Sequence, residues 1–371
     1  MRFRSELTLA MLSNALVGTS TVILRMKIII AFGTVPSCCS RGIVAGVSVA
    51  LVALGLFALP NFAVAQSPTK IYRIGWLGDG GSPAGPNRSV EEFQQGLRDV
   101  GYVQGKNVAI EYRYANSDAE RLAVLAAELV RVPVDVIVTS GEPAALAARR
   151  ATSAIPIVVT EIGMDPVKAG LVASLGRPGG NVTGLASLSN ELWQKRLALL
   201  KSLAPKATRV AVLWNPANPG NGDCVAEIKA AAPALGMQLH YFEVINANAL
   251  ASAFTGIVKE PADALVACLD SVTLEHAGSV AVFALKHGLP TLTPLKEYVQ
   301  AGALISLGAN LATQRKRVAY YVDRILKGAK AAELPVERPT LFELVVNLPT
   351  ARALGLVVPA SFMVLADELI E

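Results

Sequence analysis

Small and polar residues follow the apolar runs of this 371-residue chain, and their types and places could bind a solute. Open α/β sheets bind ligands beyond the carboxyl ends of their parallel strands, which is where such residues would lie. Hydroxyls, amides and carboxylates there can hold a small polar molecule without changing it. The predicted ligand-binding residues at strand ends are Asp79, Ser82, Ser140, Gly141, Glu142, Thr160, Glu161, Asn215, Asn218, Asp270, Ser271 and Thr293.

The Gly-rich turn that begins at Gly78 does not carry a nucleotide-binding motif. A dinucleotide site needs G-x-G-x-x-G, but the chain reads GDGGSP, with Pro83 where the third glycine would allow close helix packing. A phosphate loop needs G-x-x-x-x-G-K, but Gly80 and Gly85 are followed by Pro86. We therefore expect this turn to face a solute, and we expect no cofactor.

Catalytic and metal-binding patterns are also missing from the sequence. No G-x-S-x-G elbow occurs. The histidines lack the spacing of metal ligands; they are His240, His276 and His287. We therefore expect no catalytic residue, no bound metal and no enzymatic activity.

Two acids among the candidates carry additional expectations. Glu142 precedes Pro143 and also suits a helix start, where an acid answers the helix dipole. Asp270 ends an apolar strand and needs a partner, which a ligand amine would supply.

The first 65 residues differ from the rest and read as an export signal. Residues 42–59 form an uncharged, apolar run that follows basic residues and precedes the A-x-A sequence of 63–65. This pattern predicts cleavage before Gln66 and a periplasmic protein. The run is long, so an uncleaved membrane anchor is the alternative. Whether translation starts at Met1 or Met26 stays open.

Charge and cysteine content follow from removing this leader. Taking the five Lys and Arg and the one acid of residues 1–65 from the totals of 34 and 29 leaves 29 basic and 28 acidic residues. A net charge near zero does not indicate nucleic acid as a partner. Cys224 and Cys268 remain, and either they pair in an oxidising compartment or they are two separate buried thiols, the alternative that the sequence favours.

Short apolar runs alternate with helical patterns along the mature chain. One helical face carries Val90, Phe93, Leu97 and Val100. The predicted strands are 70–77, 107–114, 134–140, 155–160, 209–214, 238–244, 262–270 and 289–293. The pattern restarts after residue 187, which favours two doubly wound, Rossmann-like α/β domains with parallel sheets over a single eight-unit barrel.

Six segments give the sequence a specific resemblance: residues 93–115, 126–149, 155–185, 209–219, 321–356 and 366–370, among them IPIVVTEIGMDPVKAGLVASLGRPGGNVTGL and RVAVLWNPANP. They resemble the ABC-importer substrate-binding family, which has the type 1 periplasmic-binding-protein fold and includes binders of aromatic amino acids. The resemblance covers residues 70–371. It implies a first domain of 66–186 and about 309–330, and a second of 187–308 and about 331–371, joined by a hinge.

The resemblance also implies a role and partners. The protein would be a monomer that captures a small polar ligand, an amino acid or similar, and delivers it to an ABC permease with its ATPase. It would touch the membrane only through that permease. The resemblance adds Glu297 to the ligand loops, whereas Glu142 and Glu161 depart from the amino acid binders and would repel a ligand carboxylate. A periplasmic sensor and an enzyme on the same fold are the alternatives.

Overall fold

Two open β-sheets organise the chain, which the computed structural model describes over residues 70–81, 88–187, 189–339 and 341–371. Both sheets belong to a single unit of the chain, Ser67–Glu371. The predicted leader and its cleavage site lie outside the described residues.

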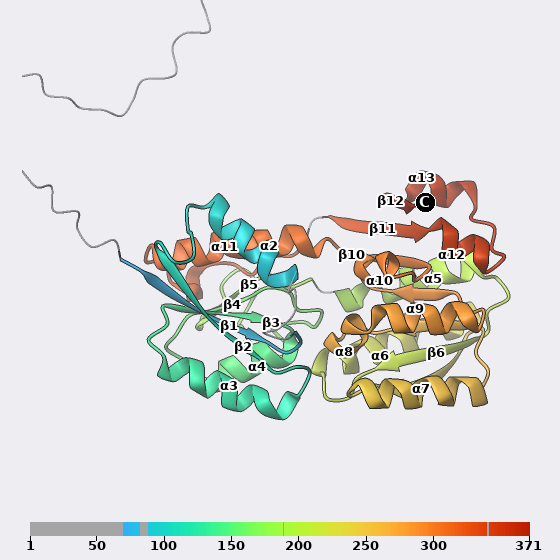
Figure 1. The fold of residues 1–371 in the computed structure, drawn as a ribbon, viewed down its shortest axis with the longest axis horizontal. Helices are drawn as coiled ribbons and strands as arrows, with labels where there is room; N and C mark the ends of the chain where they lie inside the picture. Colours follow the sequence, from blue (N-terminus) through green and yellow to red (C-terminus); the bar gives the residue numbers. More distant parts are fainter. Residues whose placement is uncertain (1–69, 82–87, 188, 340) are drawn as a thin grey trace, which may run out of the picture. The chain divides into compact units, whose positions relative to one another are not determined.

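The first sheet has five parallel strands in the order β2-β1-β3-β4-β5. Helices α2 and α11 cover one of its faces, and α3 and α4 cover the other (Figure 1). We call this part the first lobe. Its elements are β1 (Tyr72–Gly78), α2 (Arg88–Asp99), β2 (Val108–Tyr114), α3 (Ala119–Arg131), β3 (Val136–Ser140), α4 (Glu142–Ala151), β4 (Ile157–Val159), β5 (Val182–Gly184) and α11 (Leu311–Leu326).

The second sheet has the order β12-β11-β10-β9-β8-β6-β7, and only its β10–β11 pair is antiparallel. Helices α5, α6, α12 and α13 pack on one face, and α7 to α10 pack on the other. We call this part the second lobe. Its elements are η1 (Ser189–Leu192), α5 (Trp193–Leu203), β6 (Arg209–Trp214), α6 (Pro219–Ala231), η2 (Pro233–Leu235), β7 (Gln238–Glu243), α7 (Ala247–Lys259), β8 (Ala264–Ala267), α8 (Ser271–Glu275), α9 (Ala277–Lys286), β9 (Thr291–Thr293), α10 (Lys296–Gln300), β10 (Ile305–Ala309), β11 (Phe342–Asn347), α12 (Leu348–Ala353), α13 (Ala360–Leu365) and β12 (Glu368–Ile370).

Strand β1 shows how one segment serves both faces of a sheet. Successive side chains of a strand point to opposite faces. Trp76 therefore packs in the core under α2 and α11, and its neighbour Leu77 packs in the core under α3 and α4. The predicted helix with Phe93 on its buried face is confirmed as α2, but Val100 lies past the helix end and is 36% exposed.

The strand order reverses once in each lobe. In the first lobe the reversal lies between β1 and β3, and in the second it lies between β6 and β8. At such a switch point the loops from neighbouring strands leave in opposite directions and open a crevice at the carboxyl ends. The fold class predicted from the sequence is thus confirmed, and the barrel alternative is wrong because both sheets are open.

Asparagine side chains start several helices directly after strands. Asn218, Asn246, Asn310 and Asn347 each accept a hydrogen bond from a backbone N–H in the first turn of α6, α7, α11 and α12. Such caps satisfy N–H groups that have no partner inside the helix. Those at Asn218, Asn246 and Asn310 follow parallel strands and lie at the carboxyl edge of the second sheet, whereas Asn347 ends the antiparallel β11 and lies at the opposite edge.

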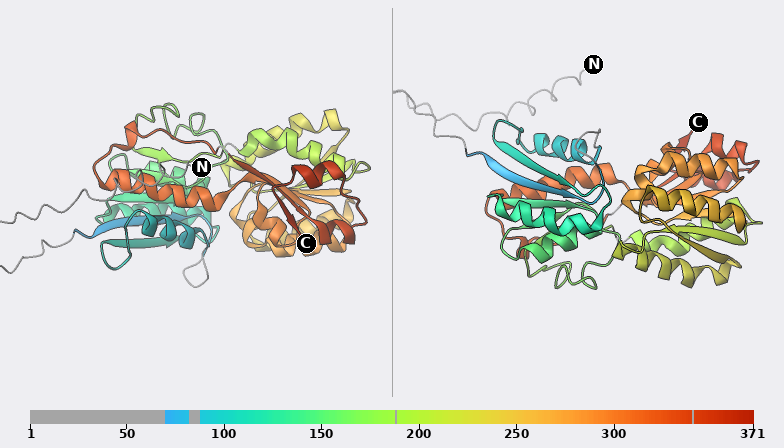
Figure 2. Two further views of the ribbon diagram at one scale, coloured as in Figure 1. Left: turned by 90° about the horizontal axis from the view of Figure 1, so that it is seen from above. Right: turned by 60° about the horizontal axis from the view of Figure 1, so that its bottom comes forward.

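The chain passes between the lobes after β5, between β10 and α11, and between η3 (Ala331–Glu333) and β11 (Figure 2). Ala331 and Val336 still pack in the cores of the first lobe. The domain boundaries at 186, 308 and 330 stay a prediction.

Arg196 ties two of these passages together. It is fully buried, and its guanidinium donates to the carbonyl oxygen of Leu307 in β10 and to the carbonyl and hydroxyl oxygens of Ser189. Burial lowers the pKa of Arg196 to about 9. The cation is held by neutral oxygens and lies against the Trp193 ring, so it links the segments without a carboxylate partner.

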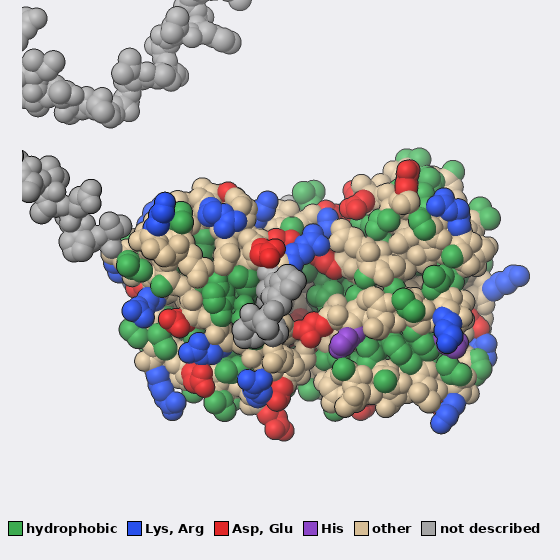
Figure 3. All heavy atoms as spheres, viewed as in Figure 1, with side chains coloured by type: hydrophobic (Ala, Val, Ile, Leu, Met, Phe, Trp, Pro, Cys, Tyr) green, Lys and Arg blue, Asp and Glu red, His purple; other side chains and the backbone are tan. Residues whose placement is uncertain are grey.

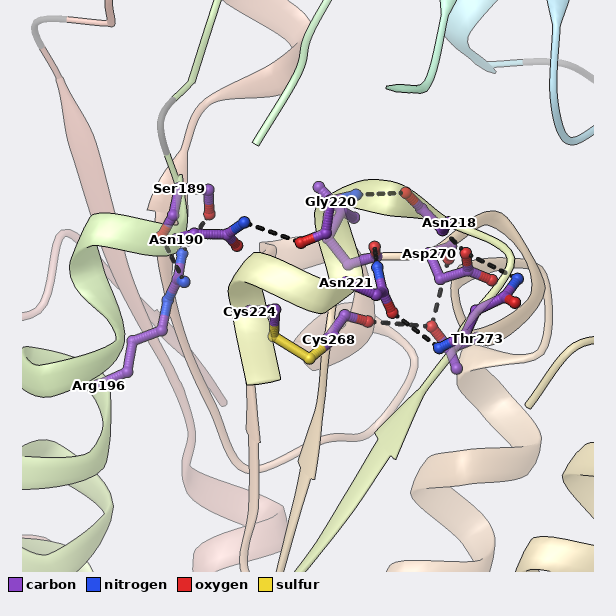
Figure 4. The surroundings of a disulfide bond; sticks show 12 residues. Ser189, Asn190, Arg196, Asn218, Gly220, Asn221, Cys224, Cys268, Asp270 and Thr273 are labelled. Atoms are coloured by element: carbon purple, nitrogen blue, oxygen red, sulfur yellow. Dashed lines mark hydrogen bonds between the residues drawn. A yellow bond between two sulfur atoms is a disulfide. The ribbon is translucent and has the colours of Figure 1, made fainter. Parts of the chain in front are cut away.

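Cys224 and Cys268 form a disulfide, so the prediction of two separate thiols is wrong (Figure 4). Cys224 lies on α6, Cys268 directly follows β8, and their Cα atoms are 6.2 Å apart in the core. The sequence could not reveal this contact, because it depends on how α6 packs across the sheet. The bond fixes the start of α6 beside the end of β8.

Replacing both cysteines with alanine should lower the free energy of unfolding by about 2–4 kcal/mol, because the unfolded chain regains the freedom that the bond removes. Urea unfolding of the oxidised proteins measures the difference. With dithiothreitol present, the parent should unfold like the variant. Equal stability of the oxidised parent and the variant would contradict a structural role for the bond.

Candidate functional site

A cavity of about 360 Å³ lies where the switch points of the two lobes face each other. Its walls come from the ends of β1 and β3 in the first lobe and from the loops after β6 and β8 in the second. Acidic and basic side chains gather near the middle of the face shown in Figure 3. The cavity combines apolar walls with a few convergent polar groups, as small-molecule sites do.

Most of the predicted site residues line this cavity. Those that do are Asp79, Ser140, Gly141, Glu142, Glu161, Asn218, Asp270, Ser271 and Glu297. Asn215 donates to Asp270 and lines an adjoining cavity. Thr160 and Thr293 are fully buried outside the lining, and the Thr293 hydroxyl faces backbone carbonyl oxygens of its own lobe. Ser82 lies outside the described residues.

Asp79 extends from the end of β1 and packs against the backbone of β3. Its N–H donates to the carbonyl oxygen of Ser140, and its Oδ1 accepts from the Gly80 N–H at 2.8 Å. Gly141 has a φ of 92°, and a Cβ there would lie 2.2 Å from Asp79 Oδ2. Only glycine leaves room for this carboxylate. Burial, together with the charges of Asp270 and Glu142, raises the pKa of Asp79 well above its usual range.

Glu142 is the first residue of α4 and lies between the lobes. Its Oε1 accepts from the Gly163 N–H at 2.7 Å. A Cβ on Gly220, at the start of α6 in the second lobe, would lie 2.8 Å from that same oxygen. Burial raises the pKa of Glu142. Glu142 therefore starts a helix and lines the cavity, and its contact with a ligand stays a prediction.

Asp270 already has protein partners, so it does not need a ligand amine to be satisfied, and its contact with a ligand stays a prediction. Its Oδ2 accepts from the side-chain amide of Asn218 at 3.1 Å (Figure 4). The same oxygen accepts from the Asn215 amide at 3.1 Å, and Oδ1 accepts from the Val272 N–H at 3.0 Å. Burial raises its pKa, although these donors oppose the effect. Asn221 holds the two loops together, because its side chain accepts from the Asn215 N–H after β6 and donates to the Leu269 carbonyl oxygen after β8.

Arg315 is a cavity residue that the sequence analysis missed. It lies on α11, is 3% exposed, and donates to Glu92 at 2.9 Å and to Glu161 at 3.3 Å. Helical spacing puts it in line with buried Leu311 and Val318, so a charge within an apolar stripe was the available signal. The cavity lining also includes Trp76, Arg88 and Glu275, which carried no strand-end signal.

Contacts between the lobes close the cavity on several sides. The Gly81 N–H of the first lobe donates to Glu275 of the second. The hydroxyls of Ser117 and Ser271 lie 3.1 Å apart. On α2, Arg88 donates to Gln300 of α10 at 3.1 Å. These bonds join residues that a rotation of the lobes would separate.

Within the described residues, no group of three or more His, Cys, Asp or Glu side chains could hold a metal ion. Among the same residues, no helix has the length and apolar content that crossing a membrane requires.

Comparisons with known proteins cover most of the chain. A family model described as ABC transporter substrate binding protein matches residues 84–370. A tyrosine-binding protein of Clostridioides difficile (strain R20291) is 27% identical over 270 residues, which are 73% of this chain and 77% of that protein.

Two solved structures share this fold. An ABC domain from Streptococcus pneumonia in complex with L-Trp has a TM-score of 0.72 and 26% identity, over 81% of this chain and 100% of the other. A ligand-free, open substrate-binding protein with adhesive properties from Clostridium difficile has a TM-score of 0.55 and 26% identity, over 81% and 99% of the two chains.

Gly141→Ala should lower the free energy of unfolding by about 1–3 kcal/mol, because its positive φ strains any side chain and the new methyl group displaces the Asp79 carboxylate. Urea unfolding measures the loss. Gly101→Ala is the matched control, since Gly101 has a φ of 91° and a Cβ there meets nothing within 4 Å. Equal losses in the two variants would contradict the contact between Gly141 and Asp79.

Proposed function

Because the chain belongs to the family of ABC transporter substrate-binding proteins, we propose that its cavity captures one small polar solute and that the loaded protein delivers it to a permease driven by a cytoplasmic ATPase. The solute is of the size class of an amino acid. The observation that best supports this proposal is the cavity where the switch points of the two lobes face each other, because its polar groups come from both lobes.

Binding in such a cavity is coupled to closure of the lobes. A solute that contacts both walls stabilises the closed arrangement, so part of its binding free energy goes into bending the hinge. The contacts between the lobes support a closed arrangement here. At equal identity, the chain is more similar to the L-Trp complex than to the ligand-free open relative, which supports the same interpretation.

We propose that the protein binds its solute without transforming it. Carboxylates with raised pKa values can indicate catalysis. Here Asp270 and Glu142 are held by backbone N–H groups and amides, an arrangement that fixes a binding wall. The sequence also lacks a nucleophile motif and a cofactor motif.

We also propose that the protein is exported to the periplasm and that its leader is cleaved before Gln66. The mature protein acts in the periplasm as a monomer. The apolar run of 42–59 and the A-x-A sequence of 63–65 support this proposal. The disulfide supports it as well, since such bonds persist in oxidising compartments.

Protein purified without denaturant should release a small polar solute on unfolding, in about equimolar amount, because solvent reaches a closed cavity poorly. Mass spectrometry of the released material identifies it. Small-angle scattering should then show expansion of the emptied protein and compaction when the solute is returned. The proposed function would be contradicted if the purified protein releases no solute and if its dimensions in solution change with no fraction of a cell extract.

N-terminal sequencing of periplasmic material should begin within a few residues of Gln66, because signal peptidase recognises the A-x-A sequence. Ala65→Arg should block this cleavage and leave the leader attached. Retention of the parent chain in the membrane with its leader intact would instead support the anchor alternative.

A further inference from the structure

The cavity between the lobes holds far more negative than positive charge. The basic residues in its lining are Arg88 and Arg315. The carboxylates in the lining are Asp79, Glu142, Glu161, Asp270, Glu275 and Glu297.

Both arginines already pair with carboxylates of the protein, although the Nε of Arg315 is buried without a partner among the described residues. Arg315 already pairs with Glu92 and Glu161, at 2.9 Å and 3.3 Å. Arg88 pairs with Glu92 at 2.8 Å, and its side chain is 52% exposed. The positive charge near the cavity is therefore compensated by the protein itself.

The five remaining acids of the lining come from both lobes, and Arg315 and Arg88 lie close enough to act on one of them, Glu297. Asp79 and Glu142 come from the first lobe, whereas Asp270, Glu275 and Glu297 come from the second. Among the described residues, none of these five forms an ion pair with Lys, Arg or His. Closing the lobes therefore brings like charges together in a poorly hydrated space, where their repulsion is strong.

Unpartnered oxygens in the lining also indicate a ligand with hydrogen-bond donors. Glu161 is 9% exposed, and its Oε2 has no partner among the described residues. The Oε1 of Glu297 is likewise unpartnered. Apolar walls complete the cavity, with Trp76, Leu269 and Leu274 among the lining residues. An unpartnered, buried carboxylate oxygen is costly unless a bound molecule supplies a donor.

From this arrangement we propose that the solute is a small organic cation, with one or two ammonium or guanidinium groups on an apolar body and no carboxylate. This inference rests on the proposed solute-binding function. The N–H donors of the cation pair with acids of both lobes and replace their repulsion by attraction, which holds the lobes closed. A zwitterionic amino acid would set its own carboxylate against the same acids.

The affinity for a cation should depend on pH in one direction. Burial raises the pKa values of Asp79, Glu142, Asp270 and Glu297, so these groups retain protons more readily in the empty closed cavity. A cation displaces those protons, so its affinity should fall as the pH falls. The other charged groups that face them are Glu161, Glu275, Arg88 and Arg315, with Glu92 behind the arginines.

Matched amines and amino acids test this proposal, because the members of each pair differ only in the carboxylate. The pairs are tryptamine with L-tryptophan, tyramine with L-tyrosine, and 1,5-diaminopentane with L-lysine. Calorimetry of the emptied full-length mature protein should show at least tenfold tighter binding of the amine in one pair or more. Proton release, measured in two buffers of different ionisation enthalpy, should accompany amine binding.

Variants that replace a carboxylate with an amide of nearly the same shape distinguish an effect of charge on binding from a loss of folded structure. Asp79→Asn and Glu142→Gln keep the oxygens that accept backbone N–H groups, so each should weaken amine binding about fivefold or more and reduce proton release. The same variants should not lower the unfolding temperature of the empty protein, because they relieve repulsion. Glu333→Gln, at an exposed acid outside the cavity, should change affinity less than twofold.

The outcomes distinguish this inference from the proposed function. An amino acid that binds as tightly as its amine in every pair that binds would overturn the cation inference. A released native solute without a net positive charge would overturn it too, and both results would leave the solute-binding function standing. A protein that releases no solute and binds none of the probes would count against both.

Discussion

The facing acids of the two lobes are the constraint on which the rest of the structure depends. Carboxylates brought together in a cavity of this size repel one another, and burial strips them of the water that would screen them. The protein tolerates them because most accept hydrogen bonds from N–H groups and amides, and because Arg315 neutralises part of the charge on one side. The negative charge that stays uncompensated is what the proposed solute has to balance.

The two lobes hold their acids in different ways. In the second lobe, Asp270 is fixed by two asparagines, a helix N–H and, through α6, the disulfide. In the first lobe, Asp79 depends on the absence of a side chain at Gly141. Arg196 joins two of the passages between the lobes through hydrogen bonds to the carbonyl oxygens of Leu307 and Ser189.

Much of the site could be predicted because parallel strands end at one edge of a sheet. Asp79, Glu142 and Asp270 each follow an apolar run, and the topology brings those ends together. Thr160 follows such a run too, but side chains alternate at a strand end, so it faces the core while its neighbour Glu161 reaches the cavity. Arg315 and the cysteine pair could not be placed in this way, because their contacts depend on how helices pack across the sheets.

The disulfide makes the stability of a newly made chain depend on whether its two thiols have been oxidised. Cys224 and Cys268 stay reduced wherever thiols are kept reduced, so α6 then lacks its covalent link to the end of β8. A newly made chain with reduced thiols is accordingly less stable than the oxidised chain. The wall that carries Asp270 therefore gains its full rigidity only in an oxidising compartment.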